Sequence, residues 1–398
     1  MRLLRILLIV LGAIISLPVL LFSYLYVTEP VVAARFVEMF TAKEGDYSAL
    51  TPRSAAVGDR PYVFSRAKDG EFTITRDALS KMQDYADAHN SFSLIVIHRG
   101  VIQAEWYATG WDAARPAQSQ SMHKSVLPLL IQAAIERGAI ESVNDSIGGY
   151  IPEWQNDSRG DITIEDLLVM SSGLYAPPFS INPYSDDFLV LFGTDITPVL
   201  LRTTMDGVAG EAWEYNNSAS ELLGLILERA TAMPYAQFLE EVLWGPMGGL
   251  RAEVWLDAEN GKGHSNCCLI TTARDWAVFG LMLLNHGARD GQQIVSADFV
   301  RQMTSPAATS PWYGYQIWTA DPGGENPWLS LTKGYQRTEP FLRDDTYFAS
   351  GYGAQRVYVV PSEDLVIVRM GPSRGPSPVR PEWDNAYLVN TAIRHIVP

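Results

Sequence analysis

The hydrophobic pattern separates a strongly apolar N-terminal segment from the rest of the chain. Arg2 and Arg5 precede an uncharged run from Ile6 to Val27. At 1.5 Å per residue, a helix of this length spans the hydrocarbon core of a bilayer, which is about 30 Å thick. The basic end favours the cytoplasmic side, so the remaining chain is expected outside the cytoplasm. We predict an N-terminal transmembrane anchor over 1–27, a membrane-proximal lead-in over 28–74 and a folded domain over 75–398.

A cleaved signal peptide and a buried core helix are the two alternatives for this segment. The apolar region of a signal peptide is about 7–15 residues long, which is shorter than the run from Ile6 to Val27. Val32-Ala33-Ala34 nevertheless offers small residues for cleavage. A helix that packs one face into the core of a soluble domain has a polar face on the other side, and this run has none. The pattern therefore favours an anchor that is retained.

Helical and strand-like periodicities alternate after residue 75. Apolar residues at helical spacing predict helices over 75–89, 121–136, 161–170, 218–230, 235–243, 272–285 and 384–396, with a break at Pro128. Runs rich in β-branched and aromatic residues predict strands over 93–98, 101–107, 313–320, 346–349, 355–360 and 365–370. Strands near both ends, with helices between them, predict an α+β fold. In this fold an antiparallel sheet flanked by helices, an α/β sandwich, carries an inserted and mostly helical subdomain.

One long segment, residues 171–215, has no regular pattern and is rich in Pro, Gly, Tyr and Phe. Loops of this length inside a compact domain usually carry function. Its aromatic side chains either line an apolar pocket or pack the loop onto the domain, and both interpretations stay open. These side chains are Tyr175, Phe179, Tyr184, Phe188 and Trp213.

Composition narrows the partners and the chemistry. The formal net charge of -15 argues against nucleic acid, because phosphate binding requires a basic surface. The 6 histidines show no spacing typical of a metal site, so neither a metal nor a cofactor is predicted. The two cysteines, Cys267 and Cys268, are neighbours, and we expect two buried thiols rather than a disulfide between them.

The pattern Ser-x-x-Lys occurs at Ser65–Lys68, Ser121–Lys124 and Ser330–Lys333. Only the second match opens an apolar helical run, where residues three apart share a face, so Ser121 and Lys124 can meet. A serine hydroxyl attacks a carbonyl group when a base takes its proton, and a lysine whose pKa is lowered by burial is such a base. An exposed serine and lysine on an ordinary helix is the alternative for an isolated match.

A second motif, Tyr215-Asn216-Asn217-Ser218, ends the long loop directly before a helical run. At this place Tyr215 can relay protons, and Asn217 can hold Lys124 or a substrate carbonyl group. The alternative is a turn in which Asn217 or Ser218 only caps the following helix.

A third motif is the glycine-containing strand from Ala349 to Gln355. Glycines in a strand allow a ligand to approach the backbone closely. The N–H of Tyr352, opposite the N–H of Ser121, would form an oxyanion hole. Ser350, Gly351 and Tyr352 are therefore candidate substrate-binding residues, and a bulged strand is the alternative.

Together these motifs resemble those of the serine β-lactamase and penicillin-binding protein superfamily, in an order similar to its class C branch. Residues 162–174 and 210–217 are also similar to that branch, and the resemblance covers roughly residues 75–396. It implies a β-lactamase/transpeptidase-like fold. The roles that it implies are Ser121 as the nucleophile, Lys124 and Tyr215 as the general base and acid, Asn217 as a binding residue and Tyr352 as the second oxyanion N–H.

One position departs from the family pattern, because Ala349 stands where the third motif usually begins with Lys or His. In this respect the chain is more similar to the nylon-oligomer hydrolases and β-lactamase-like esterases of the superfamily. The resemblance therefore implies a serine hydrolase that cleaves an ester or an amide through an acyl-enzyme on Ser121. A penicillin-binding D,D-peptidase or β-lactamase is one alternative. A non-catalytic envelope binding module is the other, and retention of Ser121, Lys124 and Tyr215 together disfavours it.

Overall fold

A seven-stranded sheet forms the centre of the computed structural model, which describes residues 19–43, 45, 47–48, 50–178, 180–320, 337–372 and 383–397. Its strands, in spatial order, are β10 (Trp318–Thr319), β11 (Tyr347–Gly351), β12 (Gln355–Val360), β13 (Leu365–Met370), β3 (Ser93–His98), β4 (Val101–Tyr107) and β2 (Ser65–Arg66). Neighbouring strands are antiparallel except β2 and β4. The predicted union of N-terminal and C-terminal strands is confirmed, because β13 pairs with β3.

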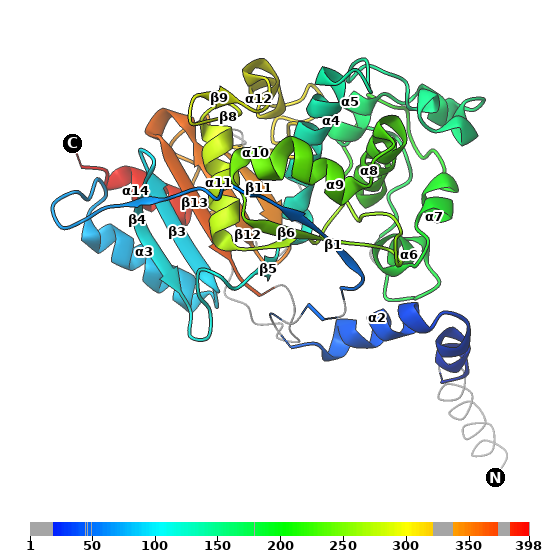
Figure 1. The fold of residues 1–398 in the computed structure, drawn as a ribbon, viewed down its shortest axis with the longest axis horizontal. Helices are drawn as coiled ribbons and strands as arrows, with labels where there is room; N and C mark the ends of the chain where they lie inside the picture. The colour runs from blue at the N-terminus through cyan, green and yellow to red at the C-terminus, as the bar shows by residue number, and fades with distance from the viewer. Residues whose placement is uncertain are drawn as a thin grey trace, which may run out of the picture.

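Helices cover both faces of this sheet (Figure 1). α3 (Arg76–Ala88) and α14 (Tyr387–Arg394) contact each other on one face, and α11 (Ala273–Leu284) packs against β12 and β13 on the other. Every residue of β3, β12 and β13 is consequently buried, as expected for continuous apolar runs. The predicted antiparallel sheet between helices is thus confirmed.

The inserted helical subdomain lies between β4 and β10 in the chain, on the right of Figure 1. Its centre is α8, which contacts both α4 and α5. The α-helices of this part are α4 (Leu127–Glu136), α5 (Ile164–Leu168), α6 (Asp186–Phe192), α7 (Thr197–Leu201), α8 (Asn217–Thr231), α9 (Tyr235–Leu239), α10 (Gly245–Met247) and α12 (Ala297–Met303). α6 and α7 lie in the segment 171–215, for which no regular element was expected.

A second, smaller sheet does not follow from the sequence pattern. Its strands, in spatial order, are β1 (Arg53–Val57), β6 (Arg251–Trp255), β7 (Ile270–Thr271) and β5 (Ala117–Gln118). β7 and β5 have 2 residues each, too few for a periodicity to be visible. β1 lies within the expected lead-in and pairs with β6 along its whole length, so this part of the lead-in belongs to the folded domain.

The strand expected over 313–320 is much shorter in the structure. Only Trp318 and Thr319 pair with β11, while Tyr313 forms a bridge to Trp318. The segment therefore folds back on itself before it joins the sheet. The aromatic and β-branched residues of this segment suggested a strand. In the structure Tyr313, Tyr315 and Ile317 instead pack into the main core.

The N-terminal part is helical over 19–28 and again in α2 (Pro30–Thr41). From residue 19 onward, where the described part of the chain begins, no helix is long and apolar enough to cross a membrane. The greater part of the expected anchor over 1–27 lies outside the described residues. The anchor therefore stays a prediction.

Cys267 and Cys268 form a disulfide, so the expectation of two thiols is wrong. Cys268 has a φ of 75°, a turn conformation that brings the two neighbouring side chains together. Both are buried beside Trp255 and Ile270, so the expected burial is confirmed although the redox state is not.

Candidate active site

Ser121 lies near the start of a 3₁₀ helix, Gln120–Val126, which we call the Ser-Lys turn. The turn passes directly into α4, whose first turn contains Pro128. The Leu127 N–H donates to the Lys124 carbonyl oxygen, closing the tighter hydrogen-bonded ring of a 3₁₀ helix. The helix changes type at Leu127, directly before Pro128, so the predicted turn is a 3₁₀ helix rather than an α-helix, and the kink expected from Pro128 stays a prediction.

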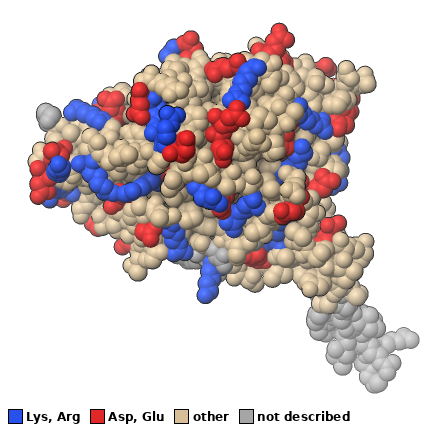
Figure 2. Space-filling model, viewed as in Figure 1, with Lys and Arg blue, Asp and Glu red and all other residues tan. Residues whose placement is uncertain are grey.

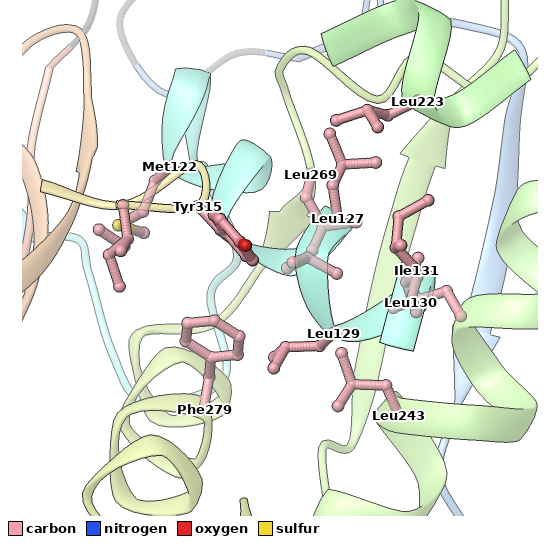
Figure 3. Packing of buried hydrophobic residues seen from close by; sticks show 14 of the residues in the cluster. Met122, Leu127, Leu129, Leu130, Ile131, Leu223, Leu243, Leu269, Phe279 and Tyr315 are labelled. Atoms are coloured by element: carbon pink, nitrogen blue, oxygen red, sulfur yellow. The ribbon is translucent and has the colours of Figure 1, made fainter. Parts of the chain in front are cut away.

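The hydrophobic core holds the Ser-Lys turn in place. Met122 and Val126 have no exposed surface, and they join a cluster with Leu127, Leu130 and Phe279 (Figure 3). Side chains three apart eclipse one another in a 3₁₀ helix, so Ser121 and Lys124 share one face, while Met122 and Val126 anchor the other two faces in the core. Ser121 stays partly exposed, whereas Lys124 is 1% exposed. The hydroxyl is thus accessible to a substrate and the amine is not accessible to bulk water.

Three oxygen atoms surround the amine of Lys124. Its Nζ lies 3.2 Å from Ser121 Oγ, 2.9 Å from Asn217 Oδ1 and 2.5 Å from the carbonyl oxygen of Asn266. It also lies 5.1 Å from the centre of the Tyr215 ring. The structure therefore brings all four predicted groups of the first two motifs to one point.

Burial sets the protonation of this amine. Removal from water lowers the pKa of Lys124 to about 7, and the negative charge of Glu221 acts in the opposite direction. A substantial share of the enzyme therefore holds the neutral amine near neutral pH. This is the condition that the sequence argument requires of a lysine base.

The Tyr-Asn-Asn motif joins the long loop to α8. Asn216, rather than Asn217 or Ser218, caps the helix by accepting from the Ser218 N–H. Its Nδ2 donates to the carbonyl oxygens of Leu174 and Tyr175. Because Asn216 takes the cap, the Asn217 side chain is available to Lys124.

The end of β11 lies directly against the Ser-Lys turn. A Cβ atom on Gly351 would come within 2.2 Å of the Ser119 carbonyl oxygen, so only glycine permits this approach. Ser350 is partly exposed beside it, and Tyr352, directly after it, is 61% exposed. The structure therefore brings the third motif next to the nucleophile. Gln120, the residue before Ser121, has a φ of 52°, a rare backbone conformation of the kind often found at functional sites.

Sequence reasoning missed Glu221, a buried residue that supports the surroundings of Lys124. Glu221, which is 2% exposed, accepts hydrogen bonds from the N–H and the hydroxyl of Ser265 and lies 3.1 Å from His264 Nδ1. Burial alone would raise the pKa of Glu221, but its hydrogen bonds to His264 and Ser265 lower it. Glu221 thus fixes the segment that presents the Asn266 carbonyl oxygen. A backbone carbonyl carries no sequence signal.

His123 is a second buried group beneath the turn. Its Nδ1 lies 2.8 Å from the Cys267 carbonyl oxygen, and its Nε2 lies 3.0 Å from the Tyr235 hydroxyl. Burial lowers the pKa of His123 to about 4, so the ring is neutral at physiological pH. It joins the Ser-Lys turn to the same segment that supplies the Asn266 carbonyl oxygen.

Among the aromatic residues of the long loop, the structure shows packing of some rings and exposure of others, and an apolar pocket lined by them stays a prediction. Phe188 is fully buried against Phe192, which is packing, while Tyr175 and Tyr184 are exposed. Trp213 lies beside Tyr215 in a ring cluster with Trp312, Tyr313 and Trp318. Phe179 lies outside the described residues.

The two other Ser-x-x-Lys matches do not form this arrangement. Ser65 and Lys68 are exposed at the edge of the sheet. Ser330 and Lys333 lie outside the described residues. Among the residues that the structure describes, no group of three or more His, Cys, Asp or Glu is arranged to hold a metal ion.

The central sheet, its helical insertion and the Ser-Lys turn define a serine hydrolase with a β-lactamase-like fold. The chain belongs to the beta-lactamase family, whose model, described as Beta-lactamase, matches residues 79–391. The recognition of this superfamily from the three motifs is confirmed.

Three relatives illustrate the similarity. The 6-aminohexanoate-dimer hydrolase of Paenarthrobacter ureafaciens is 24% identical over 304 residues, which cover 73% of this chain and 74% of that protein. A Bacillus anthracis structure, provisionally assigned as a 6-aminohexanoate-dimer hydrolase, has a TM-score of 0.67 at 20% identity and covers 89% of this chain and 91% of its own. A Bacteroides dorei DSM 17855 structure, provisionally assigned as a β-lactamase, has a TM-score of 0.65 at 17% identity, with 81% and 99% covered. The two structures show the shared fold.

Proposed function

We propose that the protein hydrolyses a neutral ester or a linear amide through an acyl-enzyme on Ser121. One observation carries the proposal, namely the three oxygen atoms around the Lys124 amine. The Asn217 and Asn266 oxygens are amide and peptide carbonyls and can only accept hydrogen bonds. A neutral amine therefore directs its two N–H groups at them, which leaves its lone pair facing the Ser121 hydroxyl.

The reaction follows from this orientation. As Ser121 Oγ attacks the substrate carbonyl carbon, its proton passes to Lys124 Nζ. The N–H groups of Ser121 and Tyr352 bind the oxygen that becomes negative in the tetrahedral intermediate. Lys124 and Tyr215 return the proton to the departing alcohol or amine. A water molecule then attacks the acyl-enzyme and gives its proton to the same groups, which pass it to Ser121 Oγ as the acid leaves, so the neutral amine and the serine hydroxyl are restored.

The proposed substrate class depends on which cations near the third motif could bind a substrate carboxylate. Ala349 is 1% exposed and joins the apolar core, so this position offers no cation to a substrate carboxylate. The Arg356 guanidinium is buried and donates to the carbonyl oxygens of Gly351 and Gln355 and to Asn385. Similarity to a hydrolase that acts on the 6-aminohexanoate dimer supports an amide as the substrate.

Placement of the enzyme is part of the same proposal. The uncharged run from Ile6 to Val27 supports a retained anchor, with the domain on the extracytoplasmic side. Protease digestion of sealed spheroplasts tests this, because the folded domain should be digested from outside. Protection of the domain until the membrane is opened would contradict the placement.

A hydrolysis panel tests the chemistry. The full chain in detergent is assayed on a nitrophenyl ester, the linear dimer of 6-aminohexanoate and a D-amino-acid dipeptide, with Ser121→Ala beside it. Ser65→Ala is the matched control, because this serine stands in the same four-residue pattern but is exposed elsewhere. We expect Ser121→Ala to abolish turnover with the fold intact and Ser65→Ala to leave it unchanged. Full activity of Ser121→Ala would refute the assignment.

A further inference from the structure

The N-terminal helices are fixed to the domain rather than attached by a loose linker. Arg35 of α2 is 3% exposed, and its guanidinium donates to backbone carbonyl oxygens of the domain and of the segment between α2 and the domain. These belong to Thr51, Phe192, Gly193, Leu256 and Asp257, at 2.7 to 3.2 Å. Five such bonds from one buried group define the position of α2 on the domain.

Apolar packing reinforces this contact on the side of α6. Phe36 of α2 lies with its ring centre 5.8 Å from that of Phe188. Leu25, Val32 and Ala33 are buried in the same cluster. The helix over 19–28 and α2 therefore form one unit with α6.

The long loop that contains α6 also contacts the active site, at its other end. Asn216, between Tyr215 and Asn217, donates to the carbonyl oxygens of Leu174 and Tyr175. Further along the loop, the Tyr184 hydroxyl donates to the Leu21 carbonyl oxygen at 3.0 Å. One segment, residues 174–192, thus runs from the wall of the active site to the N-terminal helices.

The outer side of this unit is strongly apolar. Half of the exposed large apolar side chains in the described part of the chain lie on the two N-terminal helices, and the exposed Ile181 and Tyr184 lie on the neighbouring loop. They are Val19, Leu20, Leu21, Tyr24, Tyr26, Val27, Val31, Val37 and Phe40, with Ile181 and Tyr184. In Figure 2 the projection at the N-terminal end is almost free of charged side chains, in contrast to the rest of the visible face. We call these residues the apolar apron.

We propose that the apolar apron rests on the outer interface of a lipid bilayer and holds the active-site loop beside it. The chain itself supplies the argument for a lipid partner, because the residues that precede the apron are uncharged from Ile6 onward. An anchor formed by this run ends near Val27, so it brings the far end of the helix over 19–28, and α2 beyond it, to the outer interface. Tyrosine is enriched at this depth, where its ring is in lipid and its hydroxyl in water, and the apron carries Tyr24 and Tyr26.

The contact with lipid bears on the class of substrate, and this step rests on the proposed function. The loop carries Ile181 and Tyr184 of the apron and is bonded at Leu174 and Tyr175 to Asn216, beside Tyr215, so we expect Ser121 to receive its substrate from the lipid interface. The substrate class that fits is an amphipathic ester or amide whose apolar part stays in lipid.

Site-specific labels test the contact directly. A polarity-sensitive fluorophore is attached at Phe40→Cys or Ile181→Cys in the full chain, reconstituted in nanodiscs of phosphatidylcholine and phosphatidylglycerol. Val63→Cys is the control, because Val63 is 87% exposed and lies outside the apron. We expect quenching by a lipid that carries a shallow spin label to be several-fold stronger at 40 and 181 than at 63. Equal, weak quenching at all three positions would overturn the proposal.

Two further readouts separate the remaining outcomes. Excimer fluorescence from pyrene at 181, without lipid quenching, would show that a second copy covers the apron and would also overturn the proposal.

Phe40→Glu with Ile181→Glu should lower kcat/KM for an ester embedded in vesicles several-fold and leave a water-soluble ester unchanged. An equal loss on both esters would show a structural role only. The labelling does not depend on hydrolysis, so its result stands even if the proposed reaction fails.

Discussion

At the scale of single residues, the proposed mechanism makes the reactivity of Ser121 depend on the charge of Lys124. The amine accepts the serine proton only when it is neutral, and burial lowers the pKa of Lys124 to about 7. Below this pKa the ammonium form dominates and cannot act as a base. We therefore expect kcat/KM to fall as the pH is lowered through about 7, which a pH–rate profile measures. A flat profile between pH 5 and 9 would contradict this role of Lys124.

Glu221 is a positioning residue that acts through this amine. Its negative charge raises the pKa of Lys124, against the larger effect of burial. Glu221→Gln should therefore move the acidic limb of the pH–rate profile to lower pH while its oxygen still accepts from Ser265. Glu241→Gln is the matched control, because Glu241 forms an exposed pair with Arg137. An unchanged limb in Glu221→Gln would show that Glu221 supports only the fold.

Lys124 and Tyr215 are expected to act as one proton path. Lys124→Ala and Tyr215→Phe should each lower the acylation rate by about 10²–10⁴-fold, the usual contribution of a general acid or base. The double variant should lose little more than the worse single variant, because groups that act as a unit are not additive. Single-turnover kinetics measure these rates. Losses that multiply independently would remove one of the two from the path.

At the scale of elements, long periodic segments were predictable and short ones were not. The hairpin of β3 and β4 has the predicted bounds, and α3, α8 and α11 begin and end within one or two residues of their predicted limits. The strands β5 and β7 have 2 residues each and are defined by pairing partners far away in the chain. Such pairings depend on tertiary structure, which local periodicity does not contain.

In the active site, too, some groups could be predicted from the sequence and others could not. Ser121, Lys124, Tyr215 and Asn217 follow from motifs, because their chemistry requires particular side chains. The Asn266 carbonyl oxygen, which completes the amine's surroundings, belongs to the backbone and can come from any residue. The 3₁₀ form of the Ser-Lys turn was also missed, because apolar spacing does not distinguish it from an α-helix over so few residues.

The contact between β11 and the Ser-Lys turn yields a prediction at this scale. A Cβ on Gly351 would lie 2.2 Å from the Ser119 carbonyl oxygen, so Gly351→Ala must push the strand away from Ser121. Overpacking of this kind costs about 1–3 kcal/mol of stability. We expect a lower Tm and a larger fall in kcat than in KM. Gly149→Ala is the control, because a Cβ there meets nothing within 4 Å. Full activity of Gly351→Ala would show that this close contact is dispensable.

At the scale of the whole molecule, charge favours neutral substrates. The chain carries a formal net charge of -15, which repels an anionic substrate at long range. Ala349 also supplies no cation, and a charged hydrogen bond contributes about 1.5–3 kcal/mol, or roughly 10–150-fold in kcat/KM. We expect a neutral nitrophenyl ester to exceed a chromogenic cephalosporin in kcat/KM, and added salt to help only the cephalosporin. Efficient cephalosporin turnover at low salt would contradict this preference.

The fold brings the reacting groups together from distant parts of the chain. The Ser-Lys turn opens α4, Asn217 begins α8, and β11 belongs to the C-terminal half of the sheet. The active site therefore lies where the central sheet meets the helical insertion. Both parts must fold correctly before the groups of the proposed mechanism can meet.

Mass spectrometry of the acyl-enzyme tests the central claim most directly. The full chain is mixed with a nitrophenyl ester, quenched in acid within the first turnover and digested, and the modified peptide is sequenced. We expect that the acyl group is bound to Ser121 and that Ser121→Ala gives neither the adduct nor a burst of nitrophenol. An adduct on another residue, or turnover by Ser121→Ala with its own adduct, would contradict it.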